Sequence, residues 1–470
     1  MNAAEEYDVL VLGGGTAGKV IAWTMAKEGR RTAVVDRKYV GGSCPNVACL
    51  PSKNVIYSAK VASLVGRHRE FGIETGPISI DMAGVYARKR KMVDGIVQVH
   101  LDKYHQAGDE LIFGDGTFVA PRTLHVALRD GGERMLTADR VFVDLGTHAT
   151  MPDTPGLRET KPMTHIEALD LQRCPEHLIV LGGGYVGLEL SQALRRLGSR
   201  VTLIERSPQL IANEDGDVSQ AVLRLFQDEG IDVVLGTRVL SVDGLSGERV
   251  SLQLQDGNGT RSVEGTDILV AVGRTPNTSG IGLEKAGIEV TEKGHIRVND
   301  RLETTAPDVW AMGECAGSPY FTHVAEDDAN IILENVNGGN RSTADRLVPY
   351  CVFIDPELAR VGLNESQARA RSIAYRVASV PFDSAWRAWS ISERRGFMKT
   401  LIDARSDRIL GFTAFGPEAG ELMGTVQLAM LAGLPYTALR DAMFAHPTMT
   451  EGLKGLFMSV PQMAARAEQL

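Results

Sequence analysis

The sequence has few cysteines for its length. Its 470 residues include only five, an odd number, and the start of the chain shows no export signal, so a framework of structural disulfides is disfavoured. We therefore expect reactive or metal-binding thiols. Only Cys44 and Cys49 are close in sequence. A zinc site needs about four Cys or His ligands at short spacing, and we expect no resident metal.

The sequence also lacks a long hydrophobic run and an excess of positive charge. No uninterrupted apolar stretch reaches about 18 residues, the length of a membrane span, and the first residues do not read as a signal peptide. Lys and Arg number 50 against 59 Asp and Glu. The short basic run at 87–91 is expected to lie on a solvated helix face. We expect a cytoplasmic protein with neither nucleic acid nor membrane as a partner.

Glycine is abundant, and its placement is informative. The chain contains 50 glycines and 43% apolar residues, which indicates a globular protein of two or three domains. Residues 7–36 read as an apolar strand, a glycine turn, a helix and a second strand. Gly13, Gly15 and Gly18 fit the pattern G-x-G-x-x-G, and Asp36 ends the second strand. This pattern is typical of a dinucleotide site, where the helix start faces a pyrophosphate and the acid contacts a ribose.

A second copy of this unit occupies residues 177–205. Its glycines and acid are Gly182, Gly184, Gly187 and Glu205, and in both copies the acid follows the first glycine by 23 residues. One such motif is a weak signal, but two with strand, helix and acid in register predict two bound dinucleotides. Glu205 should repel the 2′-phosphate of NADPH, whereas Arg206 could attract it, so NADH is favoured.

Directly after the first unit comes the segment 41–53, GGSCPNVACLPSK. It resembles the pattern G-G-T-C-x-N-x-G-C-x-P-S-K of the flavoprotein disulfide reductases, with Ser43 for Thr and Ala48 for Gly. The resemblance implies bound FAD, with Gly42 and Ser43 in its site. It also implies that Cys49 contacts the flavin while Cys44 exchanges with the substrate.

The spacing of the two cysteines makes a demand on the backbone. Five residues of regular helix rise about 7.5 Å, which places two sulfurs on different faces and too far apart for a disulfide. We therefore expect an irregular turn around Pro45 and Asn46 that becomes helical near Pro51 and Ser52. The helix start and Lys53 should favour a thiolate.

The resemblance extends to other residues of the redox centre. It implies that Lys53 lies by the flavin and pairs with Glu189, and that Tyr185 covers the flavin until nicotinamide displaces it. The segments 266–277 and 306–317 resemble the family's two remaining FAD signatures, and the segment 141–157, a degenerate copy of the family's crossover motif, is expected to mark a domain boundary. They contribute Gly146, Gly273, Arg274, Gly313 and Glu314 to the predicted cofactor sites.

The predicted fold is α/β, with two Rossmann-like domains for FAD and NAD(P) and a C-terminal α/β dimerisation domain. We expect FAD-binding segments at 1–150 and 274–345, an NAD(P)-binding domain at 151–273, and the dimerisation domain at 346–470. In this last domain HPTMTEG resembles the family's H-P-T-x-x-E. That likeness implies a homodimer in which His446, oriented by Glu451, enters the partner's active site as an acid and base.

The electron acceptor is less determined than the reaction type. The segments 344–362 and 431–453 look most like mercuric reductases and a related copper-reducing flavoprotein, which favours a metal ion or a small disulfide. No cysteine follows Cys351, so the C-terminal pair that delivers mercury is missing. The alternatives are a dihydrolipoamide dehydrogenase and a thiol redox sensor without turnover. His323 is predicted either to reach the site or to cap a helix.

Overall fold

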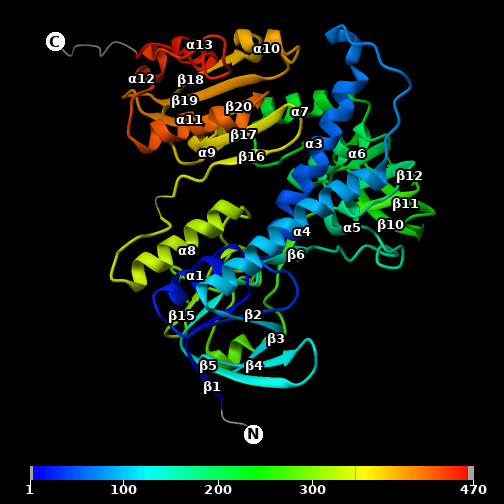
Figure 1. The fold of residues 1–470 in the computed structure, drawn as a ribbon. Helices are drawn as coiled ribbons and strands as arrows, with labels where there is room; N and C mark the ends of the chain where they lie inside the picture. The colour runs from blue at the N-terminus through cyan, green and yellow to red at the C-terminus, as the bar shows by residue number, and fades with distance from the viewer. Residues whose placement is uncertain (1–3, 258, 345, 464–470) are drawn as a thin grey trace, which may run out of the picture.

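The computed structural model describes residues 4–257, 259–344 and 346–463, which form three bodies, each built on its own main sheet (Figure 1). The first body contains a sheet whose parallel strands follow the order β3-β2-β1-β5-β15. The remaining strand, β4, pairs antiparallel with both β3 and β5. These strands are β1 (Glu5–Leu12), β2 (Thr32–Asp36), β3 (Glu110–Ala120), β4 (Thr123–Leu128), β5 (Glu133–Val143) and β15 (Val309–Ala311).

Helices from distant parts of the chain cover this first sheet. They are α1 (Thr16–Lys27), α2 (Ser43–Asn46), α3 (Cys49–Gly66), α4 (Met82–Ala107) and α8 (Thr322–Val336), with short 3₁₀ turns at His68–Phe71, Leu283–Ala286 and Gly313–Ala316. Because β15 pairs with β5 and α8 packs on α1, the chain returns to the first body after building the second. The domain boundaries at 150, 273 and 345 stay predictions.

The second body holds a parallel sheet of order β13-β7-β8-β9. Its strands are β7 (His177–Leu181), β8 (Arg200–Ile204), β9 (Asp232–Val234) and β13 (Asp267–Val270), beside the antiparallel β10 (Arg238–Leu245), β11 (Arg249–Asp256) and β12 (Gly259–Gly265). Its helices are α5 (His165–Leu169), α6 (Tyr185–Arg196) and α7 (Gly216–Asp228). β7 is buried along its whole length, as expected for a parallel strand covered on both faces.

Two short strands mark where the chain leaves the first body and comes back. β6 (Thr147–Ala149) pairs antiparallel with β14 (Arg274–Pro276). Helices α3 and α6 also join the two bodies, because Val55 and Ala59 of α3 share a buried cluster with Leu188 of α6.

The third body is an antiparallel sheet of order β16-β17-β20-β19-β18 with helices around it. Its elements are β16 (Tyr350–Val352), β17 (Glu357–Gly362), β18 (Tyr375–Pro381), β19 (Phe397–Asp403), β20 (Ile409–Gly416), α9 (Glu365–Ala370), α10 (Trp386–Ser390), α11 (Ala419–Leu431), α12 (Tyr436–Asp441) and α13 (Gly452–Met458), with a 3₁₀ turn at Phe382–Ser384. The predicted α/β class, with two parallel dinucleotide-type sheets and a distinct C-terminal α/β body, is confirmed.

One expectation about the surface is wrong. The basic run 87–91 lies on α4, but Lys89 is only 1% exposed. Its ammonium pairs with Asp170 and lies 4.6 Å from the centre of the Tyr86 ring. A buried lysine needs such a partner, and the partner is remote in sequence. Among the described residues, no helix has the length and apolar character of a membrane span.

Candidate redox active site

The two glycine turns have the same geometry. Gly13 and Gly182 adopt φ of +98° and +106°, which favours glycine. A Cβ on Gly18 would lie 2.2 Å from the Gly13 carbonyl oxygen, and one on Gly187 would lie 1.9 Å from that of Gly182. The third glycine of each motif therefore permits close packing of helix on strand.

The acid at the end of each second strand holds its glycine turn. Gly14 N–H donates to Asp36 Oδ2 at 2.8 Å, and Gly183 N–H donates to Glu205 Oε2 at 2.6 Å. Arg206 follows Glu205 and is exposed. The duplication predicted from the sequence therefore extends to the hydrogen bonds.

Both turns suit the pyrophosphate of a dinucleotide. Helices α1 and α6 begin at Gly15 and Gly184 as N-caps, and no side chain caps either helix. Their first N–H groups and positive dipole ends are thus left for an anion. In the first turn the buried Tyr104 hydroxyl also lacks a partner, 3.0 Å from where a Gly14 Cβ would be. These features fit FAD in the first body and a nicotinamide dinucleotide in the second.

The redox segment packs directly on the first glycine turn. Gly42 has φ of +82°, and a Cβ there would lie 2.7 Å from Gly15 Cα. Ser43 then starts the one-turn helix α2, which Asn46 stabilises by donating to the carbonyls of Val40 and Gly42. Pro45 and Asn46, predicted to form an irregular turn, lie instead within α2, and the break comes after them at Val47 and Ala48. However, α3 begins at Cys49, earlier than predicted, because Pro51 can occupy the first turn of a helix without losing a hydrogen bond.

The two thiols differ in acidity. A hydrogen bond from the Cys44 thiol, which outweighs the effect of burial, lowers the pKa of Cys49 to about 6, with help from Thr322 and Lys53. The same hydrogen bond and burial raise the pKa of Cys44. Thr322 Oγ1 lies 3.3 Å from Cys49 Sγ. The arrangement favours a thiolate on Cys49 and a proton on Cys44.

An ion pair lies one turn further along α3. Lys53 Nζ donates to Glu189 Oε2 at 2.6 Å, and Glu189 is buried on α6. Phe353 N–H donates to the other oxygen of Glu189 at 2.9 Å, while the Phe353 ring lies 4.7 Å from Lys53 Nζ. Residues from all three bodies therefore fix this pair, which the resemblance had implied.

Tyr185, the first residue of α6, lies in a group of stacked rings. Its ring centre is 5.6 Å from that of Tyr350 and 6.2 Å from that of Phe321. His323 stacks on Phe321 at 5.4 Å, and its Nε2 lies 2.8 Å from the Pro349 carbonyl oxygen. His323 thus belongs to this aromatic group.

The later cofactor segments meet at the crossover between the two bodies. Arg274 Nε lies 3.1 Å from Glu314 Oε2, and Glu314 also accepts a hydrogen bond from Thr147. Asn277 N–H donates to the Gly146 carbonyl oxygen, and Thr150 N–H donates to that of Gly273. Gly313, which precedes Glu314, adopts φ of +65°. The structure thus gathers these predicted residues, and Glu314 is part of a polar network.

His446 and Glu451 form the predicted pair. His446 Nδ1 lies 2.9 Å from Glu451 Oε2, and the histidine side chain is 63% exposed. Helices α12 and α13, on either side of His446 in the sequence, lie on the side of the third body that faces away from the first sheet (Figure 1). An exposed, oriented imidazole there is available to a second subunit.

Four site residues were not predicted: Phe321, Thr322, Tyr350 and Phe353. The motif patterns do not specify them, and each comes near the centre only through packing of distant segments. One available signal was that Phe321 and Thr322 follow the Gly313 and Glu314 segment and begin α8. Within the described residues, no group of three or more His, Cys, Asp or Glu side chains could hold a metal ion.

Comparison with known proteins decides the family. A model of the pyridine nucleotide-disulphide oxidoreductases matches residues 7–329, and one of their dimerisation domain matches residues 348–456. The chain belongs to this family. Its members are FAD-dependent enzymes that oxidise or reduce nicotinamide dinucleotides, and the predicted enzyme class is confirmed.

Several members are similar over nearly the whole chain. The probable pyridine nucleotide-disulfide oxidoreductase RclA of Escherichia coli is 32% identical, with 97% of this chain and 99% of RclA covered. The mercuric reductase of Bacillus cereus is 32% identical over 96% of this chain and 70% of that protein, and dihydrolipoyl dehydrogenase 1 of Arabidopsis thaliana is 32% identical over 97% and 91%. The solved Cu(II) complex of E. coli RclA, described as an HOCl-induced flavoprotein disulfide reductase, superimposes with a TM-score of 0.88 at 31% identity, covering 97% of this chain and 99% of that one.

Proposed function

We propose that this oxidoreductase takes two electrons from NADH and uses them to reduce the disulfide formed by Cys44 and Cys49. The dithiol then reduces a small disulfide, or it passes its two electrons to metal ions, one to each of two Cu²⁺ ions, with release of two protons and formation of the internal disulfide. The observation that carries the proposal is the packing of the segment with Cys44 and Cys49 on the first glycine turn, beside the Lys53–Glu189 ion pair. Bound FAD supplies a two-electron carrier between nicotinamide and disulfide.

The residues of the chain divide the remaining tasks. Lys53, held by buried Glu189, keeps a positive charge near Cys49 and favours its thiolate. Cys44 holds the proton of the reduced pair and is the thiol that attacks the acceptor once deprotonated. With a disulfide acceptor, the Cys44 thiolate displaces one thiolate and forms a mixed disulfide. Cys49 then attacks Cys44, releases the second thiolate and restores the internal disulfide.

His446 and Glu451 serve the active site of the other subunit in a homodimer. The match to the family's dimerisation domain supports the dimer, and the exposure of His446 supports its reach across the interface. A neutral imidazole accepts the proton of Cys44, and the imidazolium returns it to the leaving thiolate. Glu451 fixes the ring through Nδ1, which leaves Nε2 for this transfer.

NADH is the proposed reductant because Glu205 ends β8 in the ribose position of the second glycine unit. Its carboxylate would repel a 2′-phosphate, and its hydrogen bond to Gly183 fixes it near the turn. Exposed Arg206 is the feature that would favour NADPH. Steady-state kinetics with both cofactors, and with Glu205→Ala, test this preference.

The proposed acceptors are Cu²⁺ and small disulfides. The likeness to RclA supports them, since its solved structure is a Cu(II) complex of a disulfide reductase. A dihydrolipoamide dehydrogenase, which would pass two electrons from dihydrolipoamide to NAD⁺, is the second candidate function, and the Arabidopsis relative supports it.

The deciding experiment compares acceptors with one reduced enzyme. Anaerobic, NADH-reduced protein is mixed in a stopped-flow instrument with Cu²⁺, glutathione disulfide, lipoamide or Hg²⁺, and loss of the long-wavelength absorbance of the Cys49 thiolate beside the flavin is followed. We expect rapid reoxidation by at least one acceptor, and loss of that reaction in Cys44→Ser. Slow reoxidation by every acceptor would contradict turnover and favour a redox sensor.

A further inference from the structure

The strand β16 carries a tyrosine from the third body to the nicotinamide side of the site. Tyr350 is 7% exposed, and its ring is stacked with Tyr185 at 5.6 Å and an interplanar angle of 21°. It is also stacked with Phe321 at 5.7 Å and 6°. Tyr350 therefore packs against Tyr185, the first residue of α6. Its other stacking partner, Phe321, directly precedes α8.

The hydroxyl of Tyr350 is anchored on both sides. Arg360 Nε donates to it at 2.7 Å, and the hydroxyl donates to Glu214. Both partners are buried, and Arg360 Nε lies 3.2 Å from Glu214 Oε2. A buried ion pair with this geometry fixes the ring that it holds, so Tyr350 has little freedom to rotate.

Glu214 connects this anchor to the second glycine turn. It belongs to the segment after β8, in which Ile211 N–H donates to the Gly183 carbonyl oxygen at 3.0 Å. Leu210 also packs on Gly183, where a Cβ would lie 2.6 Å from its side chain. Tyr350 is thus bound to the turn by two routes, through Tyr185 and through Glu214.

We propose that Tyr350 is a positioning residue that sets how tightly NADH binds. Its stack on Tyr185 holds that ring in the position seen in the structure, in which Tyr185 would cover the flavin. The inference rests on the proposed role of Tyr185 as the residue that nicotinamide displaces. For nicotinamide to enter, the Tyr185 ring must leave its stack on Tyr350, and the loss of that contact opposes binding. Weakening the stack should therefore tighten NADH binding, whereas general damage to the site would weaken it.

The test measures the Kd of NADH from the concentration dependence of rapid flavin reduction. Tyr350→Leu removes the stack, and we expect a Kd about three- to tenfold lower, with a limiting reduction rate within about twofold of the parent. Tyr350→Phe keeps the ring but loses its anchor, and its Kd should fall about twofold. The control is Tyr436→Leu, which removes a buried tyrosine whose ring centre lies 6.3 Å from that of Phe457 elsewhere in the third body and should leave the Kd unchanged.

Tyr185→Ala separates this inference from the role on which it rests. That variant should lower the Kd by itself, and adding Tyr350→Leu should then change nothing further. If Tyr185→Ala lowers the Kd but Tyr350→Leu leaves it unchanged or raises it, the role of Tyr350 is refuted and that of Tyr185 stands. An unchanged Kd in Tyr185→Ala would overturn both. Should Tyr350→Leu fail to retain FAD, an unchanged Kd in Tyr350→Phe alone refutes the inference.

Discussion

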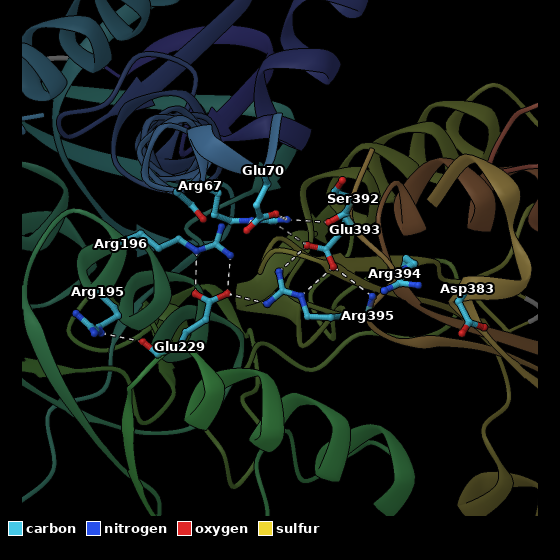
Figure 2. A pocket seen from close by; sticks show the side chains of 11 residues that line it. Arg67, Glu70, Arg195, Arg196, Glu229, Asp383, Ser392, Glu393, Arg394 and Arg395 are labelled. Carbon is cyan, nitrogen blue, oxygen red and sulfur yellow. Dashed lines mark hydrogen bonds and ion pairs between the residues drawn. The ribbon is translucent and has the colours of Figure 1, made fainter. Parts of the chain in front are cut away.

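Helices α3 and α6 pack together, yet their two ends have opposite characters. The redox site lies at their first residues, with Cys49 and Lys53 on α3 and Tyr185 and Glu189 on α6. One ion pair, Lys53–Glu189, is present there, and the pKa of Cys49 is lowered. Beside their last turns lies a cavity of about 700 Å³ where the three bodies meet (Figure 2). Its lining residues are Ser63, Arg67, Glu70, Arg195, Arg196, Glu229, Asp383, Ser392, Glu393, Arg394 and Arg395.

The charges around this cavity neutralise one another. Glu229 pairs with Arg196 at 2.6 Å and Arg395 at 3.2 Å, and Glu393 pairs with Arg395 at 2.6 Å. Arg195 and Arg196 also suit the negative end of α6. We infer that this cavity is a structural junction, whereas chemistry is confined to the site at the other end of the two helices. The comparison predicts that substitutions at the redox site mainly lower turnover, whereas substitutions around the cavity mainly lower the stability of the fold.

The largest effect is expected for Cys49→Ser. This change removes the sulfur proposed to lie beside the flavin, so turnover with any acceptor should fall on the order of 10⁴-fold or more. FAD should remain bound, since the glycine turns are unchanged. Steady-state assays and the visible spectrum check both points. The account would be contradicted by a variant that keeps normal turnover.

The next largest effect on turnover is expected at the Lys53–Glu189 ion pair. Lys53→Met removes the charge near Cys49, and we expect flavin reduction by NADH to slow roughly 100-fold. Stopped-flow reduction measures the rate. Lys60→Met is a matched control, because Lys60 lies on the same helix and pairs with Asp355 at 3.2 Å. If both variants behave alike, position on α3 rather than the pair with Glu189 is responsible.

The acidity of Cys49 gives a smaller and more specific effect. Since its pKa is about 6, the thiolate should persist above that pH and be lost as pH falls through it. In Cys44→Ser a hydroxyl still donates, and the long-wavelength absorbance of a thiolate beside flavin should titrate near pH 6. In Cys44→Ala that donor is gone, so the midpoint should rise. Equal midpoints would show that Cys44 does not set the acidity.

The smallest effect on turnover is expected at the cavity. Glu229→Gln breaks pairs with Arg196 and Arg395, and we expect a loss of roughly 2 kcal/mol in stability, because Arg196 is buried and Arg395 partly exposed. Turnover should change less than about twofold. Chemical denaturation of the holoenzyme and steady-state assays measure the two quantities. A large loss of turnover in a stably folded variant would refute the structural assignment of the cavity.

The local glycine turns could be predicted from the sequence, whereas the contacts between distant segments could not. The glycine turns were predictable because Gly13, Gly18 and Asp36 satisfy local geometric demands that a motif records. The partner of Lys53 was available only through the family resemblance. The contacts of Tyr350 with Tyr185, of Phe353 with Glu189 and of Glu229 with Arg395 were not predictable, because they join segments more than 100 residues apart whose contacts leave no periodic pattern.

The short helix α2 shows a further limit. The spacing of Cys44 and Cys49 required a break in the helix, and the break is present at Val47 and Ala48. Spacing alone could not place the start of α3 at Cys49, because several backbone paths bring two sulfurs together over five residues.

The most direct test of the account is differential alkylation of the anaerobic, FAD-loaded enzyme before and after one equivalent of NADH, read by mass spectrometry. We predict that Cys44 and Cys49 are protected from alkylation before NADH, and that Cys44 becomes labelled after it, while the labelling of Cys174, Cys315 and Cys351 does not change. Labelling of Cys44 and Cys49 that is the same before and after NADH would contradict the claim that this pair receives the electrons.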